Sequence, residues 1–189
     1  MTPHPPSRHR RLGIPGLSTG DRLAVALGRL LDDDYHWFRA VAPGGMEPID
    51  AVVVGPGGTW TLTIDGERGR FARRNTGHWY RWNGSTGSWV PWDPTPITHA
   101  RLAARRLALY LEGAGLPATV APILVPPSGM TIDVPRGEEI GVMVEASSER
   151  LARAMSAQEL LSQAQVDRIV ALLDPRQPLP RLAQATRGG

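Results

Sequence analysis

The stretch of sequence that decides the fold is residues 49–67, which read IDAVVVGPGGTWTLTIDGE. Two runs rich in β-branched and aromatic residues flank a Gly-Pro-Gly-Gly turn, a pattern typical of a β-hairpin. Each run has a carboxylate at the end away from the turn, Asp50 on the first and Asp65 on the second. We therefore predict an apolar hairpin with two acids at its open end.

Pairing Gly55 with Gly58 sets the register of this hairpin. It predicts three further cross-strand pairs, namely Val54 with Thr59, Val52 with Thr61, and Asp50 with Thr63. Because side chains alternate along a strand, Asp50, Thr63 and Asp65 are expected to share one face, with Asp65 diagonal to Asp50. The opposite face is expected to be the better core face, with Ile49, Ala51, Val53, Trp60, Leu62 and Ile64. Such neighbours are close enough to act on one ion, so the open end is a candidate site.

Composition limits the chemistry that this chain can perform. Its 189 residues fit one domain, and they include no Cys, which excludes a disulfide framework, a thiolate metal site and a cysteine nucleophile. All 21 basic residues are Arg, so no reaction that needs a lysine ammonium can occur. Neither a secretory signal nor an apolar run of about 18 residues is present. These features predict a soluble, cytoplasmic protein without a membrane partner.

The remaining elements follow from periodicity and caps. Residues 1–16 are expected to be a flexible basic arm, 17–174 the domain, and 175–189 a Pro-rich tail. A helix is expected to begin at Ser18, with Asp21 in capping-box spacing, and to end at Asp32-Asp33-Asp34. Its apolar stripe consists of Leu23, Ala26, Leu27, Leu30 and Leu31.

Strands and helices then alternate along the chain. We expect strands at 35–41, 118–125 and 140–145, helices at 96–112 and 147–155, and two aromatic strands around the turn at Asn83-Gly84. Pro122 indicates an edge or an interruption of its strand. Ser156 and Glu159 have capping-box spacing, which predicts a last helix from there to Leu173. This order predicts an α/β fold with a mixed central sheet flanked by helices.

Several motifs resemble the NERD (nuclease-related) domain family. Gly20-Asp21 is similar to the Gly-Glu that opens such domains, and IDAVVVGPGG resembles their Ile-Asp strand with its Gly-Pro-x-Gly turn. TWTLTIDGERG resembles their second strand, which normally carries Glu-x-Lys, and Pro96 to His99 resembles a Pro-x-x-Gln motif. The resemblance covers about residues 18–174 and implies a restriction-endonuclease-like core.

The resemblance also implies a set of site residues, and this chain departs from it. Active members use a helix Glu, a strand Asp and a Glu-x-Lys to hold Mg²⁺ and position water. Asp50 matches the strand Asp, but the other positions have Asp21 for Glu, Thr63 for Glu, Asp65 for Lys and His99 for Gln. If Mg²⁺ or Mn²⁺ binds, its expected ligands are Asp50 and Asp65. Otherwise no cofactor is expected.

Each of these residues also has a structural interpretation. Asp21 can cap its helix, Asp50 can bond to Thr63 or to a backbone amide at the strand end, and His99 can be a residue of a helix start. Asp65 is of a type common in turns. The sequence leaves both interpretations open.

A second candidate surface combines arginine and tryptophan. Aromatic residues interleaved with Arg can stack bases and neutralise phosphates, although Trp also fills cores and Arg also covers solvated faces. The candidate nucleic-acid-binding residues are Arg70, Arg73, Arg74, Arg81, Trp82, Arg101 and Arg105.

The sequence thus predicts a NERD-like domain without nuclease activity that binds DNA or RNA through arginine. Two alternatives remain. One is a divalent-metal nuclease with a rearranged acid set, and the other is a scaffold that uses the fold to bind a protein through exposed apolar residues such as Trp92, Leu179 and Leu182.

Overall fold

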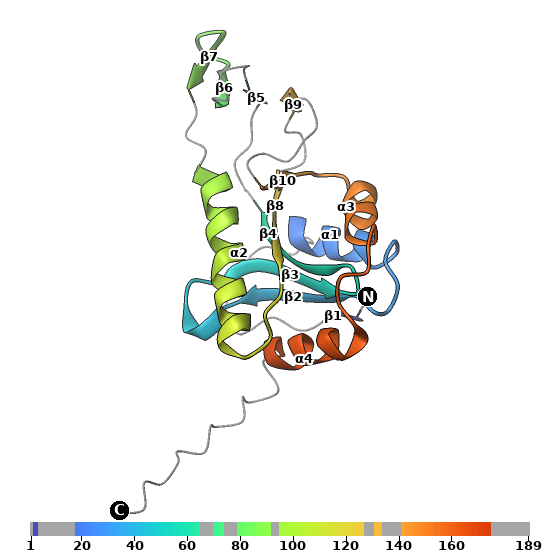
Figure 1. Ribbon diagram of the computed structural model, residues 1–189. Coiled ribbons are helices and arrows are strands. Elements are labelled where there is room, and N and C mark those ends of the chain that lie inside the picture. Colours follow the sequence, from blue (N-terminus) through green and yellow to red (C-terminus); the bar gives the residue numbers. More distant parts are fainter. Residues whose placement is uncertain are drawn as a thin grey trace, which may run out of the picture.

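We analysed a computed structural model of the chain. It describes residues 2–3, 18–64, 70–73, 79–91, 95–126, 131–133 and 141–174. Figure 1 shows a central sheet with helices on both sides and, beyond one end of the long helix, the strands of a smaller second sheet. The expected mixed α/β architecture is confirmed, and it is consistent with a restriction-endonuclease-like core.

The central sheet has six strands in the spatial order β1-β2-β3-β4-β8-β10. Their bounds are β1 Thr2–Pro3, β2 His36–Val41, β3 Ile49–Gly55, β4 Gly58–Ile64, β8 Val120–Val125 and β10 Met143–Val144. The pairs β2–β3 and β3–β4 are antiparallel, whereas β1–β2, β4–β8 and β8–β10 are parallel. Two residues of the predicted N-terminal arm thus pair with β2. The tail at 175–189 lies outside the described residues.

A second sheet has four strands in the order β7-β6-β5-β9. Their bounds are β5 Arg70–Arg73, β6 Trp79–Asn83, β7 Ser88–Pro91 and β9 Thr131–Asp133. The predicted turn at Asn83-Gly84 joins β6 to β7 as expected. The addition of β9, which pairs in parallel with β5, was not predicted.

The helices are α1 (Thr19–Leu27), α2 (Thr95–Gly113), α3 (Ser148–Met155) and α4 (Gln163–Leu173), with a short 3-10 turn, η1, at Pro43–Gly45. The predicted capping box of Ser18 and Asp21 is confirmed at α1. The helix ends at Leu27 rather than at the run of aspartates, and Leu30 is 46% exposed instead of belonging to the buried stripe.

The predicted start of the last helix is wrong. Ser156 caps the C-terminus of α3, where its hydroxyl donates to the carbonyl of Ala152, and the capping box of α4 is formed by Ser162 and Gln165. The reason is a contact distant in sequence: the amides of Leu160 and Leu161 both donate to the carbonyl of Pro56. These bonds hold the intervening segment against the hairpin turn, so the helix begins after it.

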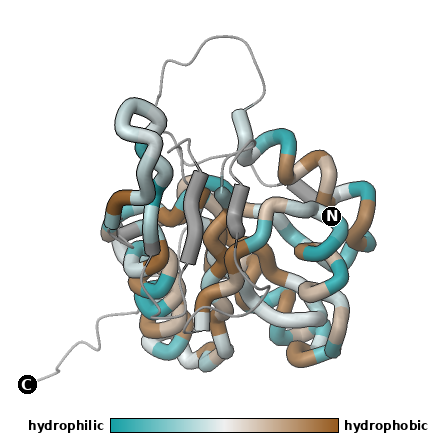
Figure 2. The backbone as a smooth tube through the Cα atoms, turned by 90° about the horizontal axis from the view of Figure 1, so that it is seen from above, coloured by the Kyte–Doolittle hydropathy of each residue, from teal (hydrophilic) through white to brown (hydrophobic). Residues whose placement is uncertain are grey.

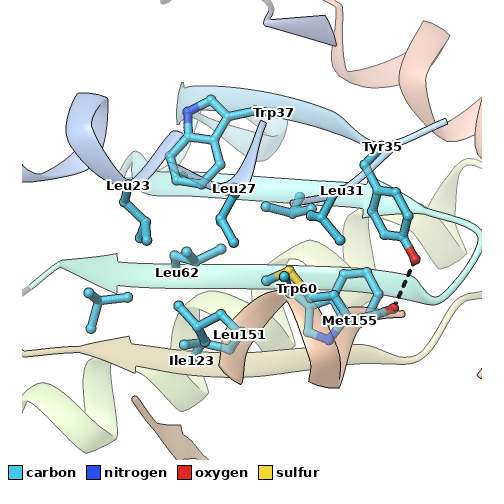
Figure 3. Packing of buried hydrophobic residues seen from close by; sticks show 14 residues of the cluster. Leu23, Leu27, Leu31, Tyr35, Trp37, Trp60, Leu62, Ile123, Leu151 and Met155 are labelled. Atoms are coloured by element: carbon cyan, nitrogen blue, oxygen red, sulfur yellow. Dashed lines mark hydrogen bonds between the residues drawn. The ribbon is translucent and has the colours of Figure 1, made fainter. Parts of the chain in front are cut away.

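The hairpin register is confirmed for Gly55 with Gly58, Val54 with Thr59, and Val52 with Thr61. Both faces of the sheet are buried, which corrects the expectation that one face is the better core. The first cluster contains Ala51, Val53, Trp60 and Leu62 and packs under α1 and α3 (Figure 3). The second contains Val52 and Val54 and packs under α2 and α4.

Ile49 belongs to the second cluster, so its predicted face is wrong. The cause is local. Ala40 has a φ of 50°, a left-handed conformation that an L-residue rarely adopts in a strand, and it interrupts the alternation of β2. Beyond it, Val41 and its partner Ile49 both pack against the second cluster.

The Gly-Pro-Gly-Gly turn is enclosed by other parts of the chain. A Cβ atom added at Gly57 would lie 1.7 Å from the carbonyl oxygen of Met155, and one at Gly55 would lie 2.3 Å from the Tyr35 ring. Tyr35 in turn donates from its hydroxyl to the same Met155 carbonyl at 3.0 Å (Figure 3).

Hydrophobic stretches elsewhere in the chain also gather toward the interior (Figure 2).

We predict that Gly57→Ala destabilises the fold by about 1–3 kcal/mol, because the added methyl group must displace backbone that is already packed. The matched control is Gly84→Ala, in a hairpin turn where an added Cβ meets nothing within 4 Å. Urea unfolding followed by circular dichroism measures both. Equal midpoints for the two variants would contradict the close packing at Gly57.

Candidate functional site

A cavity of about 250 Å³ lies between the first turns of α2 and the open end of the β3–β4 hairpin. It brings together three of the five predicted site residues, Asp50 from β3, Thr63 from β4 and His99 from α2. Its walls also include Glu47, Pro48, Ile49, Ile64, Pro96, Leu102, Ala103 and Arg106. We call this cavity the hairpin pocket.

Asp50 is exposed at the hairpin pocket and has a structural partner. One of its carboxylate oxygens accepts a hydrogen bond from the backbone amide of Ile64 at 2.8 Å. The last backbone pair between β3 and β4 is Ala51 with Leu62, so this side chain extends the connection between the strands beyond the ladder. The predicted bond of Asp50 to a backbone amide is therefore confirmed, and the second carboxylate oxygen has no partner among the described residues.

Asp21 does not line the hairpin pocket. Its carboxylate accepts from the amide and the hydroxyl of Ser18, and the guanidinium of Arg39 on β2 forms an ion pair with it. The hydrogen bond from the Ser18 hydroxyl, together with Arg39, holds the pKa of Asp21 below its ordinary value. The capping interpretation of Asp21 is confirmed.

Sequence reasoning missed two residues of the hairpin pocket, Glu47 and Arg106. Arg106 donates to the Glu47 carboxylate at 2.9 Å and so joins α2 to the loop before β3. This hydrogen bond lowers the pKa of Glu47. The only signal for Arg106 was its position seven residues after His99, on the same helix face. Glu47 had no signal, because its partner is 59 residues away.

The other predicted acid, Asp65, lies outside the described residues. Within the described part of the chain, no three His, Asp or Glu side chains converge in a way that would hold a metal ion. The Asp50 carboxylate instead accepts from a backbone amide, and the Asp21 carboxylate accepts from a hydroxyl and pairs with an arginine.

The candidate nucleic-acid-binding residues lie in two places. Arg81 is exposed on β6, and the neighbouring Trp82 packs edge to face against Trp89 of β7 with ring centroids 5.4 Å apart. Arg70 and Arg73 are in β5, which pairs with β6, whereas Arg74 and Trp92 lie outside the described residues.

Arg101 and Arg105 lie on the outer surface of α2, four residues apart. Both side chains are exposed, and neither has a carboxylate partner among the described residues. This separates them from Arg39, Arg106 and Arg150, which pair with acids.

Comparison of the chain with protein-family models, curated proteins and solved structures gave no match. The resemblance to NERD domains therefore rests on the sequence motifs alone. None of the helices in the described ranges has the length and apolar character needed to cross a membrane.

We predict that Asp21→Asn destabilises the fold by about 1 kcal/mol at neutral pH, through loss of the charged partner of Ser18 and Arg39. A lowered pKa contributes stability that is present above the unfolded-state value, which is about 3.9, and is lost as pH falls through the folded value. The difference between wild type and variant should therefore shrink below about pH 4. Urea unfolding at several pH values measures it.

The control for this experiment is Asp167→Asn, which makes the same charge change at an exposed position of α4 where the partner is the neutral amide of Gln163. A destabilisation of Asp21→Asn that persists unchanged to pH 2 would show that charge is not its cause.

Proposed function

We propose that this chain is a non-catalytic nuclease-related domain that binds nucleic acid through the arginines of α2 and of the second sheet. The single observation that carries the binding proposal is the pair Arg101 and Arg105. Cations without acidic partners, one helical turn apart, are suited to neutralising successive phosphates.

The hydrogen-bond and ion-pair partners of the site carboxylates support the non-catalytic part of the proposal. Metal-dependent phosphodiester hydrolysis needs acids that converge on one cation, with a polarised water beside them. Asp21 is committed to Ser18 and Arg39, and Asp50 shares its pocket with the hydroxyl of Thr63, a poorer ligand than the family's carboxylate. A pairing of Asp50 with Asp65 remains the route to the nuclease alternative.

The second sheet extends the proposed binding surface. β7 ends at Pro91 and α2 begins at Thr95, so the chain between these two residues spans at most about 14 Å. The start of α2 is therefore held close to the aromatic hairpin that carries Arg81 and Trp82, beyond the end of the helix in Figure 1. Half-exposed indoles beside arginine are suited to stacking unpaired bases.

Exposed leucines favour a protein partner as the second candidate function. Leu102 and Leu109 are 50% and 56% exposed, and they lie on the same side of α2 as Arg105. Large apolar side chains exposed next to cations are common at protein interfaces. The scaffold alternative would use this surface; its other residues, Trp92, Leu179 and Leu182, lie outside the described part of the chain.

We predict that replacing Arg101 and Arg105 together with Ala weakens binding to oligonucleotides. It should also reduce the slope of log K against log salt by about 1.4–1.8, since each neutralised phosphate contributes about 0.7–0.9. The measurement is a titration of labelled single- and double-stranded oligonucleotides at several salt concentrations.

The control is Arg22→Ala on α1 together with Arg29→Ala in the turn just after it. Both arginines are exposed, and their replacement removes the same charge. They lie in or directly after α1, the helix on the opposite face of the central sheet. This variant should keep the salt slope of the wild type. Absence of binding at low salt, or equal effects of the two double variants, would remove the nucleic-acid proposal and favour the scaffold.

We also predict that the protein does not cleave DNA or RNA with Mg²⁺ or Mn²⁺ above the level of a blank. The double variant Thr63→Glu and Asp65→Lys restores the family's Glu-x-Lys. Activity should appear in this variant if the backbone of the site still matches that of the family. Strong cleavage by the wild type that disappears in Asp50→Ala would establish the nuclease alternative instead.

A further inference from the structure

We infer that the hairpin pocket binds a single unstacked nucleobase and prefers guanine to thymine or uracil through one carboxylate oxygen of Asp50 and the hydroxyl of Thr63. This inference rests on the proposed nucleic-acid binding and adds a source of base preference to it.

The chemistry of the lining disfavours a phosphate group. Among the described residues, the carboxylates of Glu47 and Asp50 line the pocket, and the guanidinium of Arg106 there is already bonded to Glu47. A phosphate would therefore meet repulsion from Asp50 without gaining a fully available cation. A neutral ligand that presents N–H donors meets no such repulsion.

The walls suit a flat aromatic ring. Ile49, Pro96 and Leu102 supply apolar surface from β3 and α2, and His99 supplies an imidazole on the same helix face as Leu102 and Arg106. Proteins hold unstacked bases in this way, between apolar or aromatic side chains with polar groups at the base edge. The cavity, at about 250 Å³, is large enough for a purine.

The polar groups at the sheet end of the pocket decide which base fits. Asp50 has one oxygen bonded to the Ile64 amide and one still available, and an ionised carboxylate can only accept hydrogen bonds. Guanine presents two adjacent donors, N1–H and the N2 amino group, next to the acceptor O6. The Thr63 hydroxyl can donate to that acceptor. Uracil and thymine present a single N–H donor between two carbonyl acceptors. These carbonyl oxygens would repel the carboxylate of Asp50.

The pocket and the arginine pair are at the same level along α2. His99 is in the same turn of α2 as Arg101, and Arg105 adjoins Arg106. Arg101 and Arg105 lie on a different side of the helix from His99 and Arg106, so a strand bound to the arginines reaches the pocket by crossing α2.

The experiment compares two labelled oligonucleotides of equal length and charge, oligothymidylate and the same strand with one central guanine. Phosphate contacts are identical in the two, so the ratio of their dissociation constants reports base recognition alone. We expect the guanine strand to bind about tenfold more tightly, near the lower end of what a good carboxylate–base pair provides, since Asp50 is exposed.

Variants then assign the preference to the pocket. In Asp50→Asn the side-chain oxygen can still accept from Ile64, which preserves the strand end, but the available acceptor is replaced or turned into a donor, so the preference should fall to about twofold or less. Thr63→Val should reduce it in part. Asp167→Asn, with the same charge change on α4, should keep it. A wild type without preference overturns the inference. A preference that survives Asp50→Asn also overturns it and points to stacking at Trp82 and Trp89.

A second measurement separates this inference from the proposed function. Guanosine and uridine 5′-monophosphates are titrated while the methyl resonances of Leu102 and Ala103 are followed by NMR. Shifts with the guanine nucleotide that exceed those with the uracil nucleotide, and that Asp50→Asn removes, support the pocket even if no oligonucleotide binds. Absence of such shifts, or equal shifts with inorganic phosphate, overturns it, whereas salt-dependent oligonucleotide binding would still support the proposed function.

Discussion

The close packing of the Gly-Pro-Gly-Gly turn is the constraint on which the rest of the structure depends. Gly57 leaves room for the carbonyl of Met155, Gly55 leaves room for the Tyr35 ring, and the carbonyl of Pro56 accepts from two amides before α4. These contacts tie the turn to both α3 and the segment that leads into α4. They also fix the register of β3 and β4, and the register determines which side chains stand at the other end of the hairpin.

At that other end, the described acids have defined partners within the protein. Asp50 is in the position that the NERD resemblance assigns to a metal ligand, yet it closes the end of the strand pair by accepting from Ile64. Asp21 has an equally defined partner set in Ser18 and Arg39. Among the described residues, these acids are held by neutral donors and by arginine, and the pocket presents one carboxylate oxygen of Asp50 and the hydroxyl of Thr63.

Local features of the sequence were sufficient to predict much of this arrangement. The glycine turn defined the hairpin register, the box of Ser18 and Asp21 defined the start of α1, and Asn83-Gly84 located the second turn, because each depends on residues only a few positions apart. Errors arose where distant segments decide between equivalent local signals. Ser156 and Ser162 both begin capping-box patterns, and only the bonds to Pro56 select the second.

In the candidate site, too, local patterns predicted some features and missed those set by distant contacts. Alternation along the strands correctly predicted that Asp50 and Thr63 lie together. The backbone conformation of Ala40 places Ile49 in the other cluster, and no local sequence pattern predicts a left-handed alanine. The bridge between Glu47 and Arg106 joins residues distant in sequence and was not foreseeable from either. The membership of the chain in the NERD family stays a prediction.

Helix α2 connects three regions of the molecule. Its 19 residues extend over about 28 Å, from the end of the second sheet, past the hairpin pocket, to Leu107 and Leu111 in the core under the central sheet. One side of the helix is packed along its length, from Ile97 and Ala100 to Leu107 and Leu111, and Arg106 adds the bridge to Glu47. One continuous rod therefore sets the spacing between the pocket wall and the core.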